Sequence, residues 1–372
     1  MTGRTFGATT ALMAGAALIG SMAGAAEPFD LQALIAAAEA EPPLQVYSNT
    51  GKIVEQAEAF SKAYGVQATG TKANAAAQLE MVIREAQAGN VQGDVMQISD
   101  VAAGAAQLLP EGFVTSWVPP DLADKIDPRY QNPLAVANEA NVWAYNTQAY
   151  DKCPIENMWQ LTEPEWKGKV ALQDPLGKAS YIDWFNQMAA HGDEAVAVAY
   201  EARYGKPLET SEETATAAWV AALAANGPLL TDADEAAAEA VGAPDQAEPF
   251  VGMMSSAKFR NNVDAGAKLG ICAGMEPWAG WLYPSLGLIA TGTDSPNAAK
   301  LFIHYLLTEE GIAPQAADGK MSTNAEAKLP ADEPSGIAAL VGEMFAYDPA
   351  TAGDDWDARQ DWQDLWRVSY AK

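Results

Sequence analysis

Short apolar stretches alternate with segments of helical periodicity along the first third of the chain. Leu44–Tyr47 is apolar enough for a buried strand, and residues 53–64 carry apolar side chains at helical spacing. The unit recurs as a strand over 66–71 followed by a helix capped by Asn74, and as a strand over 94–98 followed by a helix that stops at Pro110. This alternation predicts an α/β fold built on a mostly parallel, open sheet.

A second α/β region follows the apolar segment Asn141–Asn146. The pattern predicts strands over 169–174, 250–254 and 286–290, and helices from Tyr181 and over 297–308. A closing helix is predicted over Asp354–Tyr370, with tryptophans that serve packing. Because the chain has 372 residues, more than the roughly 250–300 at which one core stops growing, we expect two lobes.

The first residues have the pattern of a secretory signal peptide. Arg4 precedes the uncharged stretch Phe6–Ile19 and the small residues Ala23–Ala26. We therefore expect residues 1–26 to be removed and the mature protein to be periplasmic, with an uncleaved N-terminal anchor as the alternative. No later run approaches the roughly 20 apolar residues that a membrane-spanning helix needs.

The strongly negative net charge of the chain excludes some classes of binding partner. The chain has 22 basic and 49 acidic residues and a net charge of −27, which becomes 21 minus 49, or −28, once Arg4 is removed. Nucleic acid and anionic membranes are poor partners for such a surface. An anionic small ligand remains possible because charges beyond about 8–10 Å are screened, but it needs a local set of donors.

Candidate catalytic and metal-binding residues are few. The chain has only two histidines, and we find no nucleophile elbow, zinc-protease motif, phosphate-binding loop or C-x-x-C pair. We expect no cofactor and no enzymatic activity; an exported carbohydrate-active enzyme and a structural envelope protein are the alternatives. The two cysteines, Cys153 and Cys272, suit an oxidising compartment where they pair, the alternative being two buried thiols.

Four segments resemble the extracellular solute-binding proteins of ABC importers, the type that includes ferric-ion, sugar-phosphate, thiamine and polyamine receptors. They are VYSNTGK, VWAYNTQAY, WKGKVALQDP, and GLIATGTDSPNAAKLFIHYLLTEEG followed by DGKMSTN. The resemblance implies a type II periplasmic binding protein fold, with a ligand cleft between two hinged lobes. It places residues 27–140 and 281–372 in the first lobe and 141–280 in the second. It also implies a monomer that delivers its ligand to the membrane permease and ATPase subunits of an importer.

Polar residues that follow the predicted strands are the candidate ligand contacts, because ligands gather at the carboxyl ends of parallel strands. Residues 177–180 open a helix, which favours an anion, although Ser180 and Asp183 also fit a capping box. Tyr145 and Trp281 lie at the chain crossings, as do Trp143 and Trp278, where rings could stack on a sugar. The full set of ligand-binding candidates is Ser48, Asn49, Thr50, Lys72, Ser99, Tyr145, Gly177, Lys178, Ser180, Ser255, Ser256 and Trp281.

The expected ligand follows from one departure from the family pattern. Ferric receptors of this type usually present a tandem tyrosine pair, and this chain contains no Tyr-Tyr. Tyr145 is the one metal-ligand candidate if the ligand is ferric ion. Serine-rich strand ends and helix starts suit phosphate oxygens better, so we expect a phosphorylated organic solute such as a sugar phosphate, with Fe(III) as the alternative.

Overall fold

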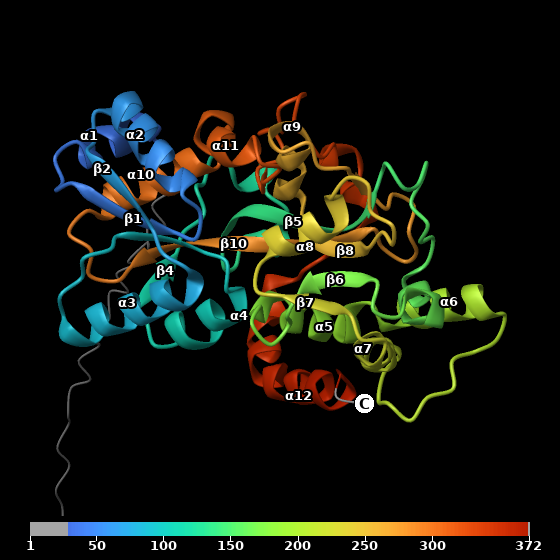
Figure 1. The fold of residues 1–372 in the computed structure, drawn as a ribbon. Coiled ribbons are helices and arrows are strands. Elements are labelled where there is room, and N and C mark those ends of the chain that lie inside the picture. The colour runs from blue at the N-terminus through green and yellow to red at the C-terminus, as the bar shows by residue number, and fades with distance from the viewer. Residues whose placement is uncertain (1–28, 371–372) are drawn as a thin grey trace, which may run out of the picture.

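The computed structural model describes residues 29–370, which form two α/β lobes side by side (Figure 1). The predicted signal peptide, residues 1–26, lies outside the described residues. Within them, no helix is both long enough and apolar enough to cross a membrane.

The described residues contain twelve strands, which form one sheet. The strands are β1 (Leu44–Ser48), β2 (Ala68–Lys72), β3 (Val95–Ile98), β4 (Val114–Ser116), β5 (Ala135–Asn146), β6 (Val170–Gln173), β7 (Leu229–Thr231), β8 (Val251–Ser255), β9 (Leu269–Ile271), β10 (Gly280–Ala290), β11 (Met321–Ser322) and β12 (Met344–Ala346). Along the main path they run in the order β2-β1-β3-β10-β5-β8-β6-β7.

The helices are α1 (Leu31–Ala38), α2 (Lys52–Tyr64), α3 (Ala75–Ala88), α4 (Val101–Ala103), α5 (Ala179–His191), α6 (Asp193–Tyr204), α7 (Ala215–Ala225), α8 (Asp234–Gly242), α9 (Asn261–Asp264), α10 (Pro296–Leu306), α11 (Glu309–Ala316) and α12 (Ala352–Tyr370). Their ends follow from local chemistry. Asn74 caps α3 by accepting from the backbone N–H of Ala77 at 2.8 Å, as predicted. Gly65 ends α2 in the left-handed conformation, with φ 71°.

The sheet is parallel at both ends and antiparallel in the middle. β1 pairs in parallel with β2 and β3, and β6 pairs in parallel with β7 and β8. The long strands β5 and β10 pair antiparallel with each other, and join the halves by antiparallel pairing with β8 and β3 respectively. The prediction of a mostly parallel sheet is therefore wrong for the centre of the sheet, where the chain crosses between the lobes.

The two crossing strands form the hinge, and their backbones approach closely at Gly280. A Cβ at Gly280 would come within 2.1 Å of the backbone oxygen of Asn141, so only glycine fits there. The register shifts between Ser285 and Leu286, midway along β10, where its pairing with β3 begins. Such an irregularity bends a strand, which suits a crossing between two differently oriented half-sheets.

The C-terminal helix spans both lobes. α12 packs against α5 and α7 in the second lobe and also against α4 in the first. In Figure 1 it runs beneath the second lobe, in red. The predicted division into 27–140 with 281–372 and 141–280 assigns α12 to the first lobe alone, and these boundaries remain a prediction. Trp362 and Trp366 are buried, so their predicted packing role is confirmed.

The second lobe contains a disulfide between Cys153 and Cys272. The bond joins the loop after β5 to the segment after β9, across 119 positions of sequence. Cys272 is also tied to the hinge, because its N–H donates to the carbonyl oxygen of Trp143 at 2.8 Å. The predicted disulfide is thus present in the structure, and the alternative of two buried free thiols is wrong.

Candidate functional site

A cleft between the lobes contains two adjoining chambers. The first, here the cationic chamber, has a volume of about 200 Å³ and is lined by Asn49, Thr50, Gly51, Lys52, Lys72, Glu139, Asp234, Ser255, Ala257, Lys258, Arg260, Gln315, Asp318 and Lys320. The second, here the hydroxyl chamber, has a volume of about 210 Å³ and is lined by Asn49, Ser99, Glu139, Asn141, Lys178, Ser180, Asp234, Tyr283 and Ser285. Three residues, Asn49, Glu139 and Asp234, line both, so the chambers are direct neighbours.

The first lobe contributes the turn between β1 and α2. The Ser48 hydroxyl is fully buried beneath the cleft and donates to Gln97 Oε1 at 3.0 Å. Asn49 Nδ2 donates to Ser99 Oγ at 2.9 Å, which joins the ends of β1 and β3. Its Oδ1 is buried and has no hydrogen-bond partner in the structure. A buried, unsatisfied amide oxygen at the wall of a chamber is available to a donor on a ligand.

The second lobe contributes the start of α5. Lys178 is the N-cap residue, and no side chain bonds to the first turn of this helix. The alternative Ser180–Asp183 capping box is wrong, because Asp183 instead accepts hydrogen bonds from Tyr283 and Arg359. The N–H groups of Ala179 and Ser180 therefore remain free near the hydroxyl chamber, whereas that of Tyr181 donates to the carbonyl oxygen of Lys178, and with the helix dipole the two free groups favour an anion.

Lys178 is held in a fixed position at the hydroxyl chamber. Its Nζ lies 2.7 and 2.9 Å from the two carboxylate oxygens of Asp234 and 3.2 Å from Asn141 Oδ1. The ammonium also lies 4.4 Å from the centre of the Tyr181 ring. These contacts remove most of the rotational freedom of the lysine before any ligand arrives, which lowers the entropy cost of binding.

Glu139 supplies a fixed negative charge from the hinge itself. It lies on β5 directly opposite Tyr283 of β10, and Lys320 Nζ lies 3.3 Å from its Oε2. Burial alone would raise the pKa of Glu139, but the charges of Lys320 and Lys178 and the hydroxyl of Ser255 outweigh it and lower that pKa. The carboxyl group is therefore ionised at neutral pH and can accept from ligand hydroxyls.

The cleft has the opposite charge to the protein as a whole. Six basic residues line the two chambers, Lys52, Lys72, Lys178, Lys258, Arg260 and Lys320, against three acidic ones, Glu139, Asp234 and Asp318. Lys52 and Lys258 also pair with Glu55 and Glu235, at 3.4 and 2.9 Å, and these two carboxylates reduce the local excess to six minus five, or +1, within a chain of net charge −27. Since distant charges are screened, this local excess decides which small ions the cleft favours.

Seven of the twelve predicted site residues line the chambers. They are Asn49, Thr50, Lys72, Ser99, Lys178, Ser180 and Ser255. Three others lie near these segments without lining a chamber. Ser48 supports the turn from below, Gly177 lies in the turn before α5, and Ser256 is buried with an unpartnered hydroxyl. That these residues contact ligand remains a prediction.

Trp143, Tyr145 and Trp281, which were predicted at the crossings, line neither chamber. Trp281 is fully buried, with its ring stacked on Trp184 at a centroid distance of 5.4 Å. Trp143 packs edge-on against Trp219, and the Tyr145 ring lies over Gly270. Trp281 and Tyr145 were therefore wrongly placed at the site. They lie on the same strand faces as Tyr283 and Asn141 but further along each strand, where Trp184 covers Trp281 and Tyr145 packs beside Gly270.

Sequence reasoning missed the hinge residues and the late basic residues. Glu139 and Asn141 lie on one face of β5, and Tyr283 and Ser285 lie on one face of β10, all at the hydroxyl chamber. Their signal is polar residues at alternate positions within otherwise apolar strands. Arg260, Asp318 and Lys320 carry no such signal, because only the fold brings them to the cleft.

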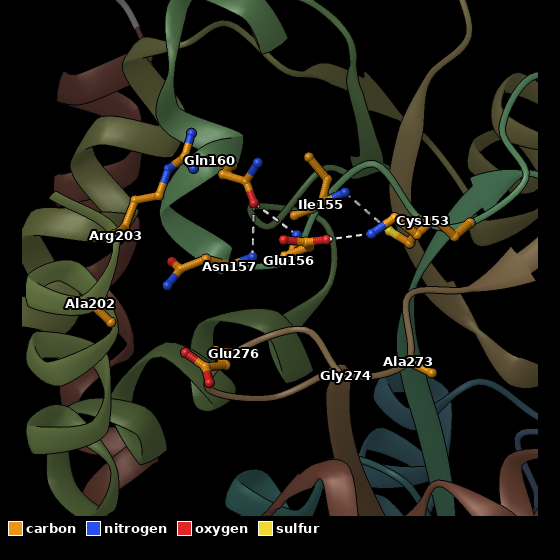
Figure 2. Close-up of a pocket in the computed structure, with 11 residues that line it drawn as sticks. Cys153, Ile155, Glu156, Asn157, Gln160, Ala202, Arg203, Ala273, Gly274 and Glu276 are labelled. Carbon is orange, nitrogen blue, oxygen red and sulfur yellow. Dashed lines mark hydrogen bonds and ion pairs between the residues drawn. The ribbon is translucent and has the colours of Figure 1, made fainter.

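A separate pocket of about 510 Å³ lies on the second lobe beside the disulfide (Figure 2). Figure 2 shows Gln160 accepting from the backbone N–H groups of Glu156 and Asn157, at 2.7 and 3.0 Å. Arg203 at its edge is paired with Glu163 through two hydrogen bonds. Several polar groups of this pocket are already paired, with one another or with neighbouring residues, so it is a weaker candidate than the cleft.

The described residues offer no evident metal centre. Within residues 29–370 no group of three or more His, Cys, Asp or Glu side chains could hold a metal ion. Tyr283 is the tyrosine that lines the hydroxyl chamber, and burial raises its pKa well above the ordinary value. A phenol held in its neutral form, with its proton donated to Asp183 at 2.9 Å, is poorly suited to bind Fe(III) as a phenolate.

Comparison with known proteins places this geometry in a family. The model of the family described as bacterial extracellular solute-binding protein matches residues 44–319. No curated protein sequence matches the chain. Iron-bound HitA from Pseudomonas aeruginosa is similar in structure, with 17% identity, a TM-score of 0.66, and coverage of 88% of this chain and 99% of that one. AfuA from Actinobacillus pleuropneumoniae, with fructose 6-phosphate bound, has 19% identity, a TM-score of 0.62, and coverage of 88% and 98%. Trichodesmium FutA, with iron and citrate, has 15% identity, a TM-score of 0.67, and coverage of 89% and 100%.

Proposed function

Because the chain belongs to the bacterial extracellular solute-binding proteins, we propose that it is the periplasmic receptor of an ABC importer, and that it captures a phosphorylated organic solute such as a sugar phosphate. The ligand is enclosed between the lobes and handed to the membrane permease. The observation that carries the ligand class is the gathering of six basic residues around the cleft of a strongly acidic protein.

The chemistry of the two chambers suits the two parts of such a ligand. The cationic chamber gathers Lys72, Lys258 and Arg260, whose positive charges suit a phosphate group. The hydroxyl chamber offers Asn49, Ser285 and the ionised Glu139, which accept from or donate to sugar hydroxyls. A solute with one anionic end and a polyol body fits both chambers together.

The carboxyl groups of the cleft support binding over catalysis. A glycosidase requires a carboxylic acid whose raised pKa keeps it protonated to donate to the leaving group. Glu139 has a lowered pKa, and Asp234 is paired with Lys178 through both oxygens. Neither carboxyl group is prepared to act as a general acid, so the exported carbohydrate-active enzyme is the weaker proposal.

Native mass spectrometry of gently purified protein tests the ligand class, because receptors that bind tightly often retain their solute. We expect a population heavier by the mass of a phosphorylated sugar. Treatment of the released solute with a phosphatase should lower the mass of that solute by one phosphate group. A mass increment equal to one iron would instead support the ferric alternative.

Ligand binding should also compact the protein. A solute that contacts both lobes binds the closed arrangement better than the open one, so it shifts the population toward the closed state. Small-angle scattering with and without fructose 6-phosphate should show a smaller radius of gyration at saturation. If the radius stays the same while calorimetry shows saturation, the hinge mechanism is wrong.

A further inference from the structure

One arginine on the C-terminal helix joins the two lobes behind the cleft. Arg359 Nη2 lies 2.5 Å from Asp100 Oδ1 of the first lobe. Its Nε and Nη2 lie 2.7 and 2.8 Å from the two carboxylate oxygens of Asp183 in the second lobe. One guanidinium therefore binds a carboxylate from each lobe, in the planar geometry that makes such pairs strong.

Both carboxylates are attached to segments that line the hydroxyl chamber. Asp100 follows Ser99 directly, and its Oδ1 also caps α4 by accepting from the N–H of Ala103 at 3.0 Å. Asp183 lies one helical turn after Ser180 and accepts from the hydroxyl of Tyr283 at 2.9 Å. The arginine thus fixes one chamber wall from each lobe and, through Tyr283, the hinge strand β10.

The bridge is shielded from water. The Asp183 side chain is fully buried, and those of Arg359 and Asp100 are only 13% and 16% exposed. Burial raises the pKa of Asp183 to about 6 although Arg359 lowers it, so this carboxylate depends on the arginine to remain charged at neutral pH. Buried charges that lose a partner are strongly unfavourable, so separating the lobes at this point has a cost.

We propose that Arg359 is a positioning residue that latches the lobes in the closed arrangement. α12 packs mainly on the second lobe, through α5 and α7, so the contact that must break when the cleft opens is the one to Asp100. The latch acts on the empty protein and sets how much of it is already closed. Its effect on affinity rests on the proposed function, but its effect on lobe separation does not.

Distance measurement between the lobes in ligand-free protein tests the latch. Nitroxide labels at V54C on α2 and V263C on α9 suit this, because both positions are exposed and the two native cysteines are bonded to each other. D100N keeps the Arg359–Asp183 pair and removes the charge of the first-lobe partner, and R359M removes both links. Both variants should shift the distance distribution toward longer, open separations, and R359K should restore part of the closed population.

R367M is the matched control, because Arg367 lies on the same helix, is 55% exposed and pairs with Asp364 on the surface. It should leave the distribution as in the native sequence. If R359M fails to fold, the distance distribution of D100N alone tests the latch. A D100N distribution identical to that of the native protein overturns the latch.

Affinity provides a second measurement that separates the latch from the ligand proposal. The apparent affinity decreases when the fraction of closed protein decreases. D100N should therefore weaken fructose 6-phosphate binding by roughly fivefold or more. A protein that does not bind fructose 6-phosphate at all contradicts the proposed ligand and leaves the distance test unaffected. A D100N variant that opens the lobes yet binds with unchanged affinity contradicts the coupling of the latch to the site.

Discussion

The double variant C153A/C272A is expected to unfold with a free energy about 5 kcal/mol lower than that of the native protein. The disulfide closes a loop of 119 positions, and in the chain-entropy model a loop of that length restricts the unfolded chain by about this amount. The loop contains most of the second lobe, including β6, β8 and α5. Equilibrium urea unfolding followed by tryptophan fluorescence measures the difference.

Reduction of the native protein provides the control for this measurement. A reducing agent should lower the stability of the native chain to that of the double variant and leave the variant itself unchanged. A difference below about 1 kcal/mol between the two oxidised proteins would show that the bond restricts the unfolded chain far less than its loop length implies.

Substitution of Lys178 should have the largest effect on ligand affinity. K178M removes an ammonium that Asp234 and Asn141 hold at the hydroxyl chamber, and it leaves the Asp234 carboxylate without its partner. The cleft then loses a donor and gains an unneutralised anion. Since a charge-assisted hydrogen bond contributes about 1.5–3 kcal/mol, we expect Kd for fructose 6-phosphate to rise about 10- to 150-fold.

K152M is the matched control for this substitution. Lys152 is 82% exposed and pairs with Glu156 at the separate pocket of Figure 2, so its loss changes the net charge of the protein equally. Calorimetric titration of both variants should show the loss of affinity in K178M alone. An equal loss in both would mean that the overall field, and not the cleft, governs binding.

Much of the fold and part of the site could be predicted from local patterns. The strand and helix that surround Ser48–Thr50 follow from short-range periodicity, and the rule that ligands gather at strand ends then places Asn49, Ser99 and Ser180 in one cleft. This succeeded because β1, β3, β6 and β8 all end at the same cleft. The rule uses only the direction in which each strand runs, so it can be applied without knowing which distant residues are in contact.

The remaining features depend on contacts between positions far apart in the sequence. Glu139 faces the cleft because β10 pairs with β5 in one particular register, and Lys320 reaches it from a segment far along the chain. Arg359 meets Asp100 across 259 positions, so the sequence pattern of α12 predicts a packing helix but gives no partner for its arginine. Trp281 was misplaced for the same reason, since Trp184, 97 positions earlier in the chain, stacks on its ring and separates it from the cleft.

Titration calorimetry with fructose 6-phosphate and with fructose tests the proposed ligand class most directly. The account predicts that the phosphorylated sugar binds at one site per chain, with Kd near the micromolar range, about −8 kcal/mol. Free fructose should bind at least about 100-fold more weakly, because it lacks the group that the cationic chamber would hold through charge-assisted hydrogen bonds. Equal affinity for the two sugars would contradict the account, as would binding of ferric ion with a coloured tyrosinate band and no binding of either sugar.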